Sequence, residues 1–403
     1  MAFKVDLLFE VEVPRPWDEG KERDRFHEAL EQAVFADQMG FDTLWFVEHH
    51  FLEEAAHSSA PDALLGALSQ RTSRARLGLG VALMPGRVNH PIRVAERAAV
   101  LDILSDGRLE MGTGRSSSPY QLRAFGVDVA NTREEWEEAT RLLPQLWTKE
   151  KFSYQGRFFS WDDKITVVPR PVQKPHPPMW VASTQPDTCA LAGQKGLGLL
   201  MPQLGGPDGA RDSIAAYKAA VANPIDPLGM FTNDQCALFT CAFANDDDDK
   251  ARVLGGQAAM WYLQCLSSIY SNDWAGQPLE AVPDSYRYHA EVRRKGLVSG
   301  GTLQTGMKRE DMLDDKAYEK MIDSAAFCIG DPRQVIETVE RYRAVGADRL
   351  VCVMQLADLR HEDLMRSIEL FGTQVIPAIR ANEARDAAAA AVVDQRLSGS
   401  PRD

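Results

Sequence analysis

The amino-acid sequence predicts an α/β fold, a single (β/α)8 TIM barrel with insertions. Apolar strand patterns alternate with helical spacings along most of the chain, and the connections between them are short. This alternation yields eight strand and helix units, the number that a closed parallel barrel requires. A barrel of this kind with insertions accommodates nearly all of the 403 residues, although length alone would suggest several domains.

The first four units are predicted within the first 150 residues. Gly40 closes the first helix, and the turn signal Ser105-Asp106-Gly107 ends the third. The predicted strands span residues 4–11, 43–48, 77–83 and 109–113, and the predicted helices span residues 24–39, 61–71, 92–104 and 133–148.

Two insertions accompany the remaining four units. The first, at about residues 150–178, contains a predicted hairpin and a proline-rich return. The second, residues 272–322, has no regular pattern, and we expect a lid there because long irregular segments in compact chains are usually functional or mobile. The remaining strands are predicted at residues 179–182, 197–201, 235–244 and 349–354, and the helices at 187–195, 212–221, 246–271, 332–345 and 362–379. Residues 1–381 then form one domain, and residues 382–403 form a tail with a peripheral helix and a loose end.

Composition excludes several classes of function. The formal net charge of -13, without a compensating basic run, argues against nucleic-acid and anionic-membrane partners. The N-terminus enters a strand pattern at once and no apolar run is long enough to span a bilayer, so we expect a cytoplasmic protein. The six cysteines lack metal-ligand or disulfide spacing and are predicted to be buried thiols.

The strongest candidate for chemistry is Glu48-His49-His50, which follows the second strand. Residues just past the carboxyl ends of barrel strands are where this architecture displays catalytic groups. A metal site is not favoured, because adjacent histidines on an extended segment point to opposite sides. His49 is the preferred proton-handling or hydrogen-bonding residue, whereas structural and functional roles stay equally open for His50.

Two further strand ends suit a phosphate group. Arg115 follows the glycines of the fourth strand and presents a planar fork, although a tight turn with a surface arginine would explain it better in isolation. After the fifth strand, residues 182–188 lead into a helix whose free N–H groups could bind an anion. Apolar residues near these elements could line a pocket for a planar ring system, or belong to the core: Trp45, Phe46, Met84, Met111, Trp180 and Met201.

The sequence resembles the bacterial-luciferase-like (LLM class) flavin-dependent monooxygenases from about residue 3 to residue 380, and residues 272–322 match poorly. The resemblance is carried by Gly40-Phe41-Asp42-Thr43-Leu44-Trp45-Phe46-Val47-Glu48-His49-His50-Phe51, His90-Pro91, Ile103-Leu104-Ser105-Asp106-Gly107-Arg108-Leu109, Gly112-Thr113-Gly114-Arg115, Phe125-Gly126 and Gly330-Asp331-Pro332. It implies a barrel that binds reduced FMN (FMNH2), activates O2 as a flavin peroxide and oxygenates a small, hydrophobic organic substrate.

The resemblance also implies roles for individual residues. His49 matches the catalytic histidine of the luciferases, with Glu48 and His50 as its motif neighbours. Gly80-Val81 falls where the family carries a non-proline cis peptide beneath the flavin ring. Arg115 matches the arginine at the flavin phosphate, and the residues that match the phosphate-binding turn after the fifth strand are Ser183, Thr184, Gln185 and Thr188. Gly114 and Ala182 are further residues expected to bind the cofactor. No metal is implied. Gly114 stands where the luciferases have a cysteine and Gln121 where they have an aspartate, so light emission is not implied.

The expected function is therefore a two-component FMNH2-dependent monooxygenase. A separate NAD(P)H:flavin reductase is expected as its partner, because no nicotinamide-binding Gly-x-Gly-x-x-Gly fingerprint follows any predicted strand. A homodimer or homotetramer is expected. Two alternatives stay open: an oxidoreductase of the same fold that transfers hydride with the deazaflavin F420, and a homologue that binds flavin without catalysis.

Overall fold

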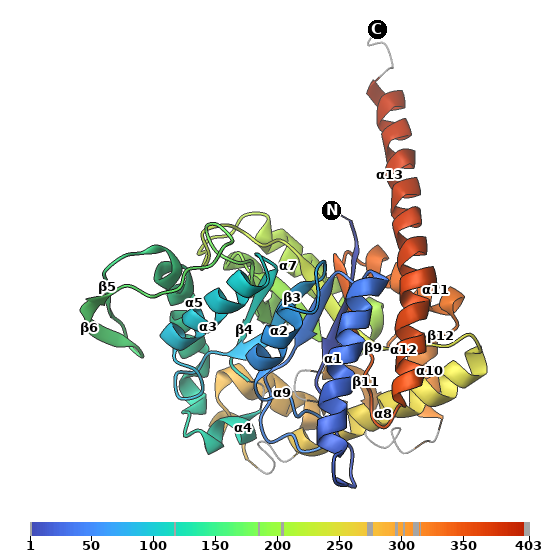
Figure 1. Ribbon diagram of the computed structural model, residues 1–403, viewed down its shortest axis with the longest axis horizontal. Coiled ribbons are helices and arrows are strands. Elements are labelled where there is room, and N and C mark those ends of the chain that lie inside the picture. The colour runs from blue at the N-terminus through green and yellow to red at the C-terminus, as the bar shows by residue number, and fades with distance from the viewer. Residues whose placement is uncertain are drawn as a thin grey trace.

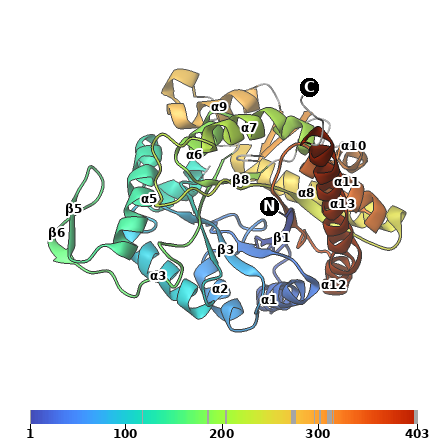
Figure 2. The ribbon, with the colours of Figure 1, turned by 90° about the horizontal axis from the view of Figure 1, so that it is seen from above.

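The structure is a closed barrel of parallel strands surrounded by helices (Figure 1, Figure 2). The computed structural model describes residues 2–398 apart from 117, 184–185, 203–204, 272–276, 295–296, 301–302, 309–313 and 315. The ring runs β1-β2-β3-β4-β7-β8-β9-β13 and closes where β13 pairs with β1. Its strands are β1 (Lys4–Phe9), β2 (Thr43–Phe46), β3 (Arg76–Leu83), β4 (Leu109–Gly114), β7 (Met179–Ala182), β8 (Gly198–Pro202), β9 (Cys236–Ala244) and β13 (Arg349–Val353). The predicted fold class is confirmed, and each strand of the ring overlaps a predicted strand.

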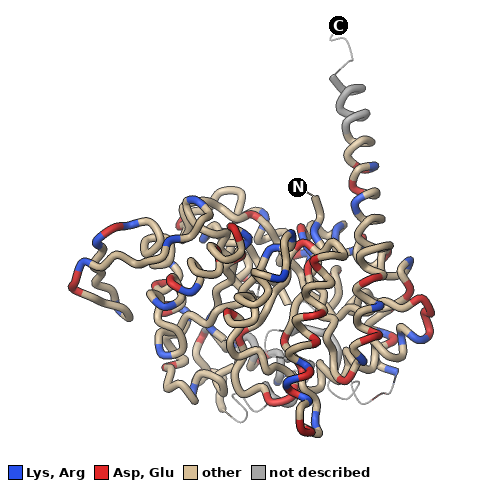
Figure 3. The backbone as a smooth tube through the Cα atoms, viewed as in Figure 1, with Lys and Arg blue, Asp and Glu red and all other residues tan. Residues whose placement is uncertain are grey.

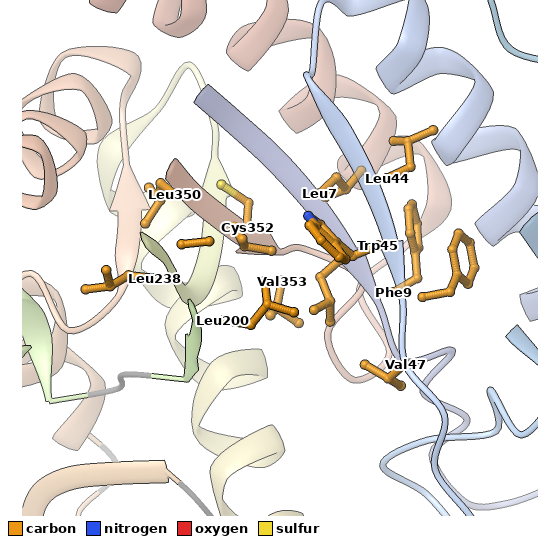
Figure 4. Packing of buried hydrophobic residues seen from close by; sticks show 14 of the residues in the cluster. Leu7, Phe9, Leu44, Trp45, Val47, Leu200, Leu238, Leu350, Cys352 and Val353 are labelled. Carbon is orange, nitrogen blue, oxygen red and sulfur yellow. The ribbon is translucent and has the colours of Figure 1, made fainter. Parts of the chain in front are cut away.

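The helices that follow these strands cover the outside of the barrel. They are α1 (Lys21–Met39), α2 (Pro61–Ser69), α3 (Pro91–Leu104), α5 (Thr132–Thr148), α6 (Pro186–Gln194), α7 (Gly206–Val221), α8 (Asp248–Ser271), α11 (Pro332–Ala344) and α12 (His361–Leu370). The strands are buried on both faces because their outer side chains pack against these helices and their inner side chains fill the barrel. Figure 4 shows both sets: Trp45 and Val353 lie between the strands, whereas Leu44 lies on the helix side of β2.

Polar and aromatic side chains fill the interior near the amino-terminal ends of the strands. The fully buried Arg349 lies 3.3 Å from Asp6 (Nη1 to Oδ2), and the indole of Trp45 donates to the same carboxylate at 3.0 Å. At Gly78 a Cβ atom would lie 2.1 Å from the Trp45 ring, so only glycine fits beside this indole. Because this half of the barrel is filled, chemistry is confined to the carboxyl ends of the strands.

The first insertion forms the predicted hairpin, β5 (Phe152–Gln155) and β6 (Ser160–Ile165), which projects from the body (Figure 1). The second insertion differs from the expectation of an irregular segment. It contains the 3-10 turn η2 (Leu279–Ala281), α9 (Asp284–Arg294), the hairpin β10 (Leu297–Gly300) and β11 (Leu303–Lys308), and α10 (Ala317–Asp323). Val282, Tyr286 and Ala290 recur at helical spacing and form a small core of their own with Val129 and Leu279. This core explains the helix that the sequence reading missed.

Three other short elements were not predicted. The three-residue strand β12 (Cys328–Gly330) pairs with the end of β9, and α4 (Pro119–Ala124) with the 3-10 turn η1 (Val129–Asn131) follows β4. Elements of this length carry too few residues to show a periodicity.

The last predicted helix is interrupted and longer than expected. A π turn, η4 (Phe371–Val375), separates α12 from α13 (Ile376–Ser398). At Gly372 a Cβ atom would lie 2.5 Å from the Met39 carbonyl oxygen, so the chain packs tightly against the end of α1. α13 then extends away from the barrel (Figure 1).

The distribution of charged residues, the hydropathy of the helices and the burial of the cysteines were compared with what the composition predicted. Acidic and basic residues are interspersed along the described chain (Figure 3). Among the described residues, no helix combines the length and the apolar character that crossing a membrane requires. The six cysteines are free thiols, and all except Cys265 are buried, as predicted.

Candidate functional site

Glu48 joins the end of β2 to the loop that follows β3. Its carboxylate accepts hydrogen bonds from the backbone N–H of Leu83 at 2.7 Å and from the Nδ2 of Asn89 at 2.8 Å and 3.1 Å. The side chain is buried, and these contacts satisfy both oxygens. Glu48 therefore positions the segment around His49, while the chemical role expected for it stays a prediction.

His50 packs into an aromatic cluster. Its ring lies edge-on to Phe125 at 4.9 Å between centroids, and its Nε2 is 3.4 Å from a carboxylate oxygen of Glu48. Its backbone N–H donates to the Oε1 of Gln121 at 3.0 Å. These contacts hold His50 in place beside His49, and the catalytic role expected for His50 stays a prediction.

His49 occupies the end of the barrel where the strands terminate. It is half-buried, and its backbone N–H donates to the Ser58 carbonyl at 3.1 Å. Burial lowers the pKa of its imidazole from 6.5 to about 4, and the neighbouring His50 acts in the same direction, against the opposing contacts with Gln121 and Glu48. His49 is therefore neutral near pH 7, where it can hydrogen-bond a ligand without carrying charge.

Arg115 and Arg133 form a cationic pair beside the first turn of α6. Arg115 follows β4, and its guanidinium donates to Thr132 at 3.1 Å and lies over the ring of Tyr286, 4.5 Å from its centroid. Burial and the charge of Arg115 lower the pKa of Arg133, against the opposing influence of Asp187 in the first turn of α6 and other neighbours. Two guanidinium groups near one helix start form a site suited to an anion.

Arg133 was not predicted as a site residue from the sequence. It occupies the second position of α5, where an arginine is ordinarily a solvated surface residue. Only the packing of α5 against the end of β4 brings it close to Arg115. Spacing in the sequence carries no signal for such a contact.

The segment expected to contact a phosphate lies in the same region. Ala182 ends β7, and the buried Ser183 donates its N–H to the Leu200 carbonyl at 2.9 Å. Thr188 is half-buried in the first turn of α6. Thr184 and Gln185 lie outside the described residues.

The strands β3 and β4 approach each other closely near the site. The peptide bond Gly80-Val81 is cis, as the family resemblance predicted, and both residues are partly exposed within a strand that is mostly buried. A Cβ atom at Gly114 would lie 2.4 Å from a methyl carbon of Val81. A larger residue at position 114 would therefore displace Val81 from its present place.

The residues expected to line an apolar pocket belong to the core instead. All six are at most 1% exposed: Trp45, Phe46, Met84, Met111, Trp180 and Met201. Trp45 packs edge-on against Trp180 inside the barrel, at 5.6 Å between ring centroids, and Phe46 stacks on Phe9 at 4.8 Å. Of the two alternatives that the sequence left open, core or lining, the structure supports the core for all six residues.

Two buried carboxyl groups at the end of β1 were also missed. Tyr262 of α8 donates its hydroxyl to Glu10 at 2.7 Å, and the backbone N–H of Ala357 donates to Glu12 at 2.5 Å. Burial raises the pKa of Glu10 to about 7 and the pKa of Glu12 well above its usual range. A signal existed, because both glutamates interrupt an otherwise apolar run, Phe9 to Val13.

A family profile for luciferase-like monooxygenases matches residues 6–349. The chain belongs to the luciferase-like monooxygenase family. Within this family it is 24% identical over 372 residues to the oxygenase component of a flavin-dependent trigonelline monooxygenase from Acinetobacter baylyi, covering 91% of this chain and 94% of that one. It is 31% identical over 310 residues to limonene 1,2-monooxygenase from Rhodococcus erythropolis, covering 75% of this chain and 76% of that one.

Solved structures of luciferase-like proteins share the barrel. The oxygenating constituent of 3,6-diketocamphane monooxygenase from Pseudomonas putida, in complex with FMN, superimposes with a TM-score of 0.67 at 20% identity, covering 94% of this chain and 98% of that one. An F420-dependent secondary alcohol dehydrogenase superimposes equally well, with a TM-score of 0.67 at 20% identity, covering 94% of this chain and 99% of that one. At this identity the likeness establishes the fold alone.

Proposed function

We propose that this protein is the oxygenase of a two-component system that uses reduced FMN and O2 to oxygenate a small, hydrophobic organic substrate. The observation that carries the proposal is the pair Arg115 and Arg133 beside the first turn of α6, at the barrel end that also carries His49. This arrangement combines an anion site with a neutral hydrogen-bonding ring. The two relatives named above are both monooxygenases, and one is the oxygenase component of its system.

The residues present fit reduced FMN. Arg115 and Arg133 would bind its phosphate with charge-assisted hydrogen bonds, supported by the first turn of α6. The partly exposed Gly80-Val81 segment would support the ring system. Reduced FMN, when bound, supplies the electrons and the reaction with O2 that oxygenation requires.

Residues of the chain would control water and protons at this site. His49, held neutral by burial, would hydrogen-bond the reacting groups without releasing a proton to them. Tyr286 of α9 covers the Arg115 guanidinium and donates to the Ser116 carbonyl at 3.2 Å, so the second insertion would close over the phosphate end and exclude water. We propose that this insertion forms the lid that the sequence led us to expect.

The alternative is hydride transfer with F420, which the equal likeness to an F420-dependent enzyme favours. The same cationic pair would bind a deazaflavin phosphate. A homologue that binds flavin without catalysis is the third possibility. The oxygenase reaction requires O2, whereas hydride transfer with F420 does not.

Oxygen uptake tests the proposal. We expect the protein to bind FMN, measured by fluorescence, and to consume O2 when reduced FMN and a suitable substrate are supplied with a reductase. Turnover with reduced F420 and without O2 would establish the alternative. Failure to change the fluorescence of either cofactor would exclude both enzymatic functions. Screening ketones, aldehydes, terpenes and alkanes for oxygen-dependent turnover would identify the substrate.

His49 is expected to couple oxygen consumption to product formation. A His49→Ala variant should retain FMN binding but release more hydrogen peroxide per O2 consumed, because a hydrogen bond that limits uncoupling is lost. The change in coupling is measured from the yields of product and hydrogen peroxide. His27→Ala, an exposed histidine on α1, is the control. If His49→Ala couples oxygen consumption to product formation as well as the unaltered protein does, His49 has no role in this coupling.

We also propose a homo-oligomer, a dimer or tetramer, in the cytoplasm. Val100, Ile103 and Leu104 are exposed on α3, and their 39–43% exposure leaves an apolar stripe that a second copy could cover. Light scattering of the purified protein tests the assembly, and a monomer at micromolar concentration would contradict it.

A further inference from the structure

The side-chain amide of Asn89 lies between Glu48 and the outer helix α3. Its Nδ2 atom donates to the Glu48 carboxylate at 2.8 Å and 3.1 Å and to the Leu83 carbonyl at 3.0 Å. Its Oδ1 atom accepts from the Nη2 of Arg97, on α3, at 2.8 Å. An amide NH2 group and a guanidinium can only donate, so all of these contacts agree with one orientation of the amide.

Arg97 fixes that orientation. If the amide were turned over, its oxygen would face the Glu48 carboxylate and the Leu83 carbonyl. Its NH2 group would face the guanidinium, so acceptors would oppose acceptors and donors would oppose donors. Because Asn89 is only 7% exposed, little water is at hand to replace the lost hydrogen bonds.

The Glu48 carboxylate depends on this amide. It is buried just past the end of β2, and a further hydrogen bond comes from the backbone N–H of Leu83 at 2.7 Å. A buried carboxylate is costly unless donors and positive charge compensate it. The positive charge at the end of this chain of hydrogen bonds is that of Arg97, and only Asn89 separates it from the carboxylate.

Arg97 belongs to the outer layer of the barrel. Its side chain is 34% exposed, and its Nε lies 3.6 Å from the Oδ2 of Asp62, on α2. The contacts therefore run from the surface formed by α2 and α3 to Glu48, the residue that directly precedes His49. They connect the helix layer with the strand end that carries the candidate site.

We propose that Arg97 and Asn89 are positioning residues that hold the Glu48 carboxylate against the end of β3 and so keep His49 in place at the carboxyl ends of the strands. Neither residue would touch cofactor or substrate. A carboxylate released from Asn89 would turn toward the imidazoles, because the Nε2 of His50 already lies 3.4 Å from it. The effect on oxygenation deepens the proposed function and rests on it, whereas the positioning does not.

Hydrogen exchange of the full-length protein without flavin tests the positioning. Mass spectrometry of peptides that contain Leu83 or His49 reports how often these amides open to water. In Arg97→Met, which keeps a long side chain but loses its charge and donors, we expect both peptides to exchange about tenfold faster. Arg97→Lys keeps a charged donor and should retain most of the protection. Arg93→Met, exposed on the same helix, is the control and should change neither peptide.

Two results of this experiment would overturn the proposal. Unchanged exchange of both peptides in Arg97→Met would show that Arg97 does not position this segment. Equal acceleration in β9, which lies outside this chain of contacts, would show a general loss of stability instead of a local one.

A double-mutant cycle shows whether Arg97 acts through Asn89. Asn89→Leu removes the amide and keeps a side chain of similar size, and it should accelerate exchange at least as much as Arg97→Met. In the Asn89→Leu background, Arg97→Met should have no further effect, so additive effects would refute the connection. If Asn89→Leu does not fold, the two Arg97 variants decide, because equal exchange in Arg97→Met and Arg97→Lys would refute it.

Turnover with reduced FMN tests the effect on oxygenation. Arg97→Met should release more hydrogen peroxide per O2 consumed and keep the FMN affinity of the unaltered protein, because Arg115 and Arg133 are unchanged. Faster exchange with unchanged peroxide release would refute the effect on coupling. A lack of FMN-dependent oxygen uptake in the unaltered protein would refute the proposed function and leave the exchange result intact.

Discussion

Single residues decide how the site would hold its cofactor. Arg115 was identifiable from its place after a glycine-rich strand end, whereas Arg133 depended on packing between α5 and the end of β4. The two guanidinium groups lie near enough for one to depress the pKa of the other. Negative charge nearby stabilises such a pair; Glu134 and Asp187 supply some of it, and a bound phosphate would add to it.

Removing either arginine should weaken binding of FMN selectively. Each charge-assisted bond contributes about 1.5–3 kcal/mol, so Arg115→Ala and Arg133→Ala should lose roughly ten- to a hundredfold in affinity. Fluorescence titration measures this. Riboflavin lacks the phosphate and should bind the variants and the unaltered protein equally. Arg333→Ala, exposed on α11, controls for loss of a positive charge. Equal losses for riboflavin and FMN would contradict the phosphate assignment.

Glu10 should make stability depend on pH. Burial raises its pKa from 4.5 to about 7, so between these values the folded protein retains a proton that the unfolded chain releases. Its stabilising contribution is fully present below pH 4.5 and is lost as the pH rises through about 7. The loss is on the order of 3 kcal/mol.

The variant Glu10→Gln should flatten this dependence. Its neutral amide keeps the acceptor for Tyr262, so the free energy of unfolding near pH 8 should rise relative to the unaltered protein. Urea unfolding at several pH values measures this, and Glu19→Gln, an exposed residue, is the control. Parallel pH profiles for Glu10→Gln and the unaltered protein would show that the Glu10 carboxyl is not perturbed.

At the scale of elements, α9 connects the second insertion to the candidate phosphate site. Tyr286 is 1% exposed and contacts Arg115, Thr132 and Ser116. Two arginines of this helix have partners away from the site: Arg287 pairs with Asp284 at 2.5 Å, and Arg294 donates to the Gln277 carbonyl. Tyr286 is the α9 side chain that the described contacts place at the site.

If α9 is part of a lid, reduced FMN should protect it from proteolysis. Trypsin cleavage after Arg287 and Arg294 should slow when reduced FMN is present, because the phosphate orders Arg115 beneath Tyr286. Mass spectrometry of the fragments measures the rates. Tyr286→Ala should lose the protection, whereas Tyr286→Phe keeps the ring and should retain most of it. Equal cleavage with and without reduced FMN would argue against a lid.

At the scale of the whole molecule, buried charged groups inside the barrel link strands from the two ends of the chain. Arg349 of β13 contacts Asp6 of β1, Thr43 of β2 and Gln235, next to β9. Arg349, Asp6 and Thr43 are fully buried, so removing Asp6 would leave the Arg349 guanidinium paired with the more distant carboxylate of Glu110, 3.6 Å away. One cooperative transition is expected, in keeping with a single domain over residues 1–381.

Asp6→Ala should therefore destabilise the whole barrel. The expected loss in the free energy of unfolding is about 3–5 kcal/mol. The exposed pair of Asp246 and Arg366, 2.8 Å apart, gives the matched comparison, and Asp246→Ala should cost less than about 1 kcal/mol. Denaturant unfolding compares the two variants. Similar losses would mean that burial does not control the strength of these pairs.

The sequence alone determined the barrel, its eight strands and the place of His49 and Arg115 at strand ends, because hydrophobic periodicity and local turn chemistry are recorded in neighbouring residues. The tertiary structure alone placed Arg133 beside Arg115, Tyr286 over the same guanidinium and Gln121 against the backbone of His50. These contacts join residues from different elements, and their spacing along the chain does not encode them. For the same reason Trp45 and Met111 proved to be core rather than lining, since only closure of the barrel fixes which inner side chains are covered.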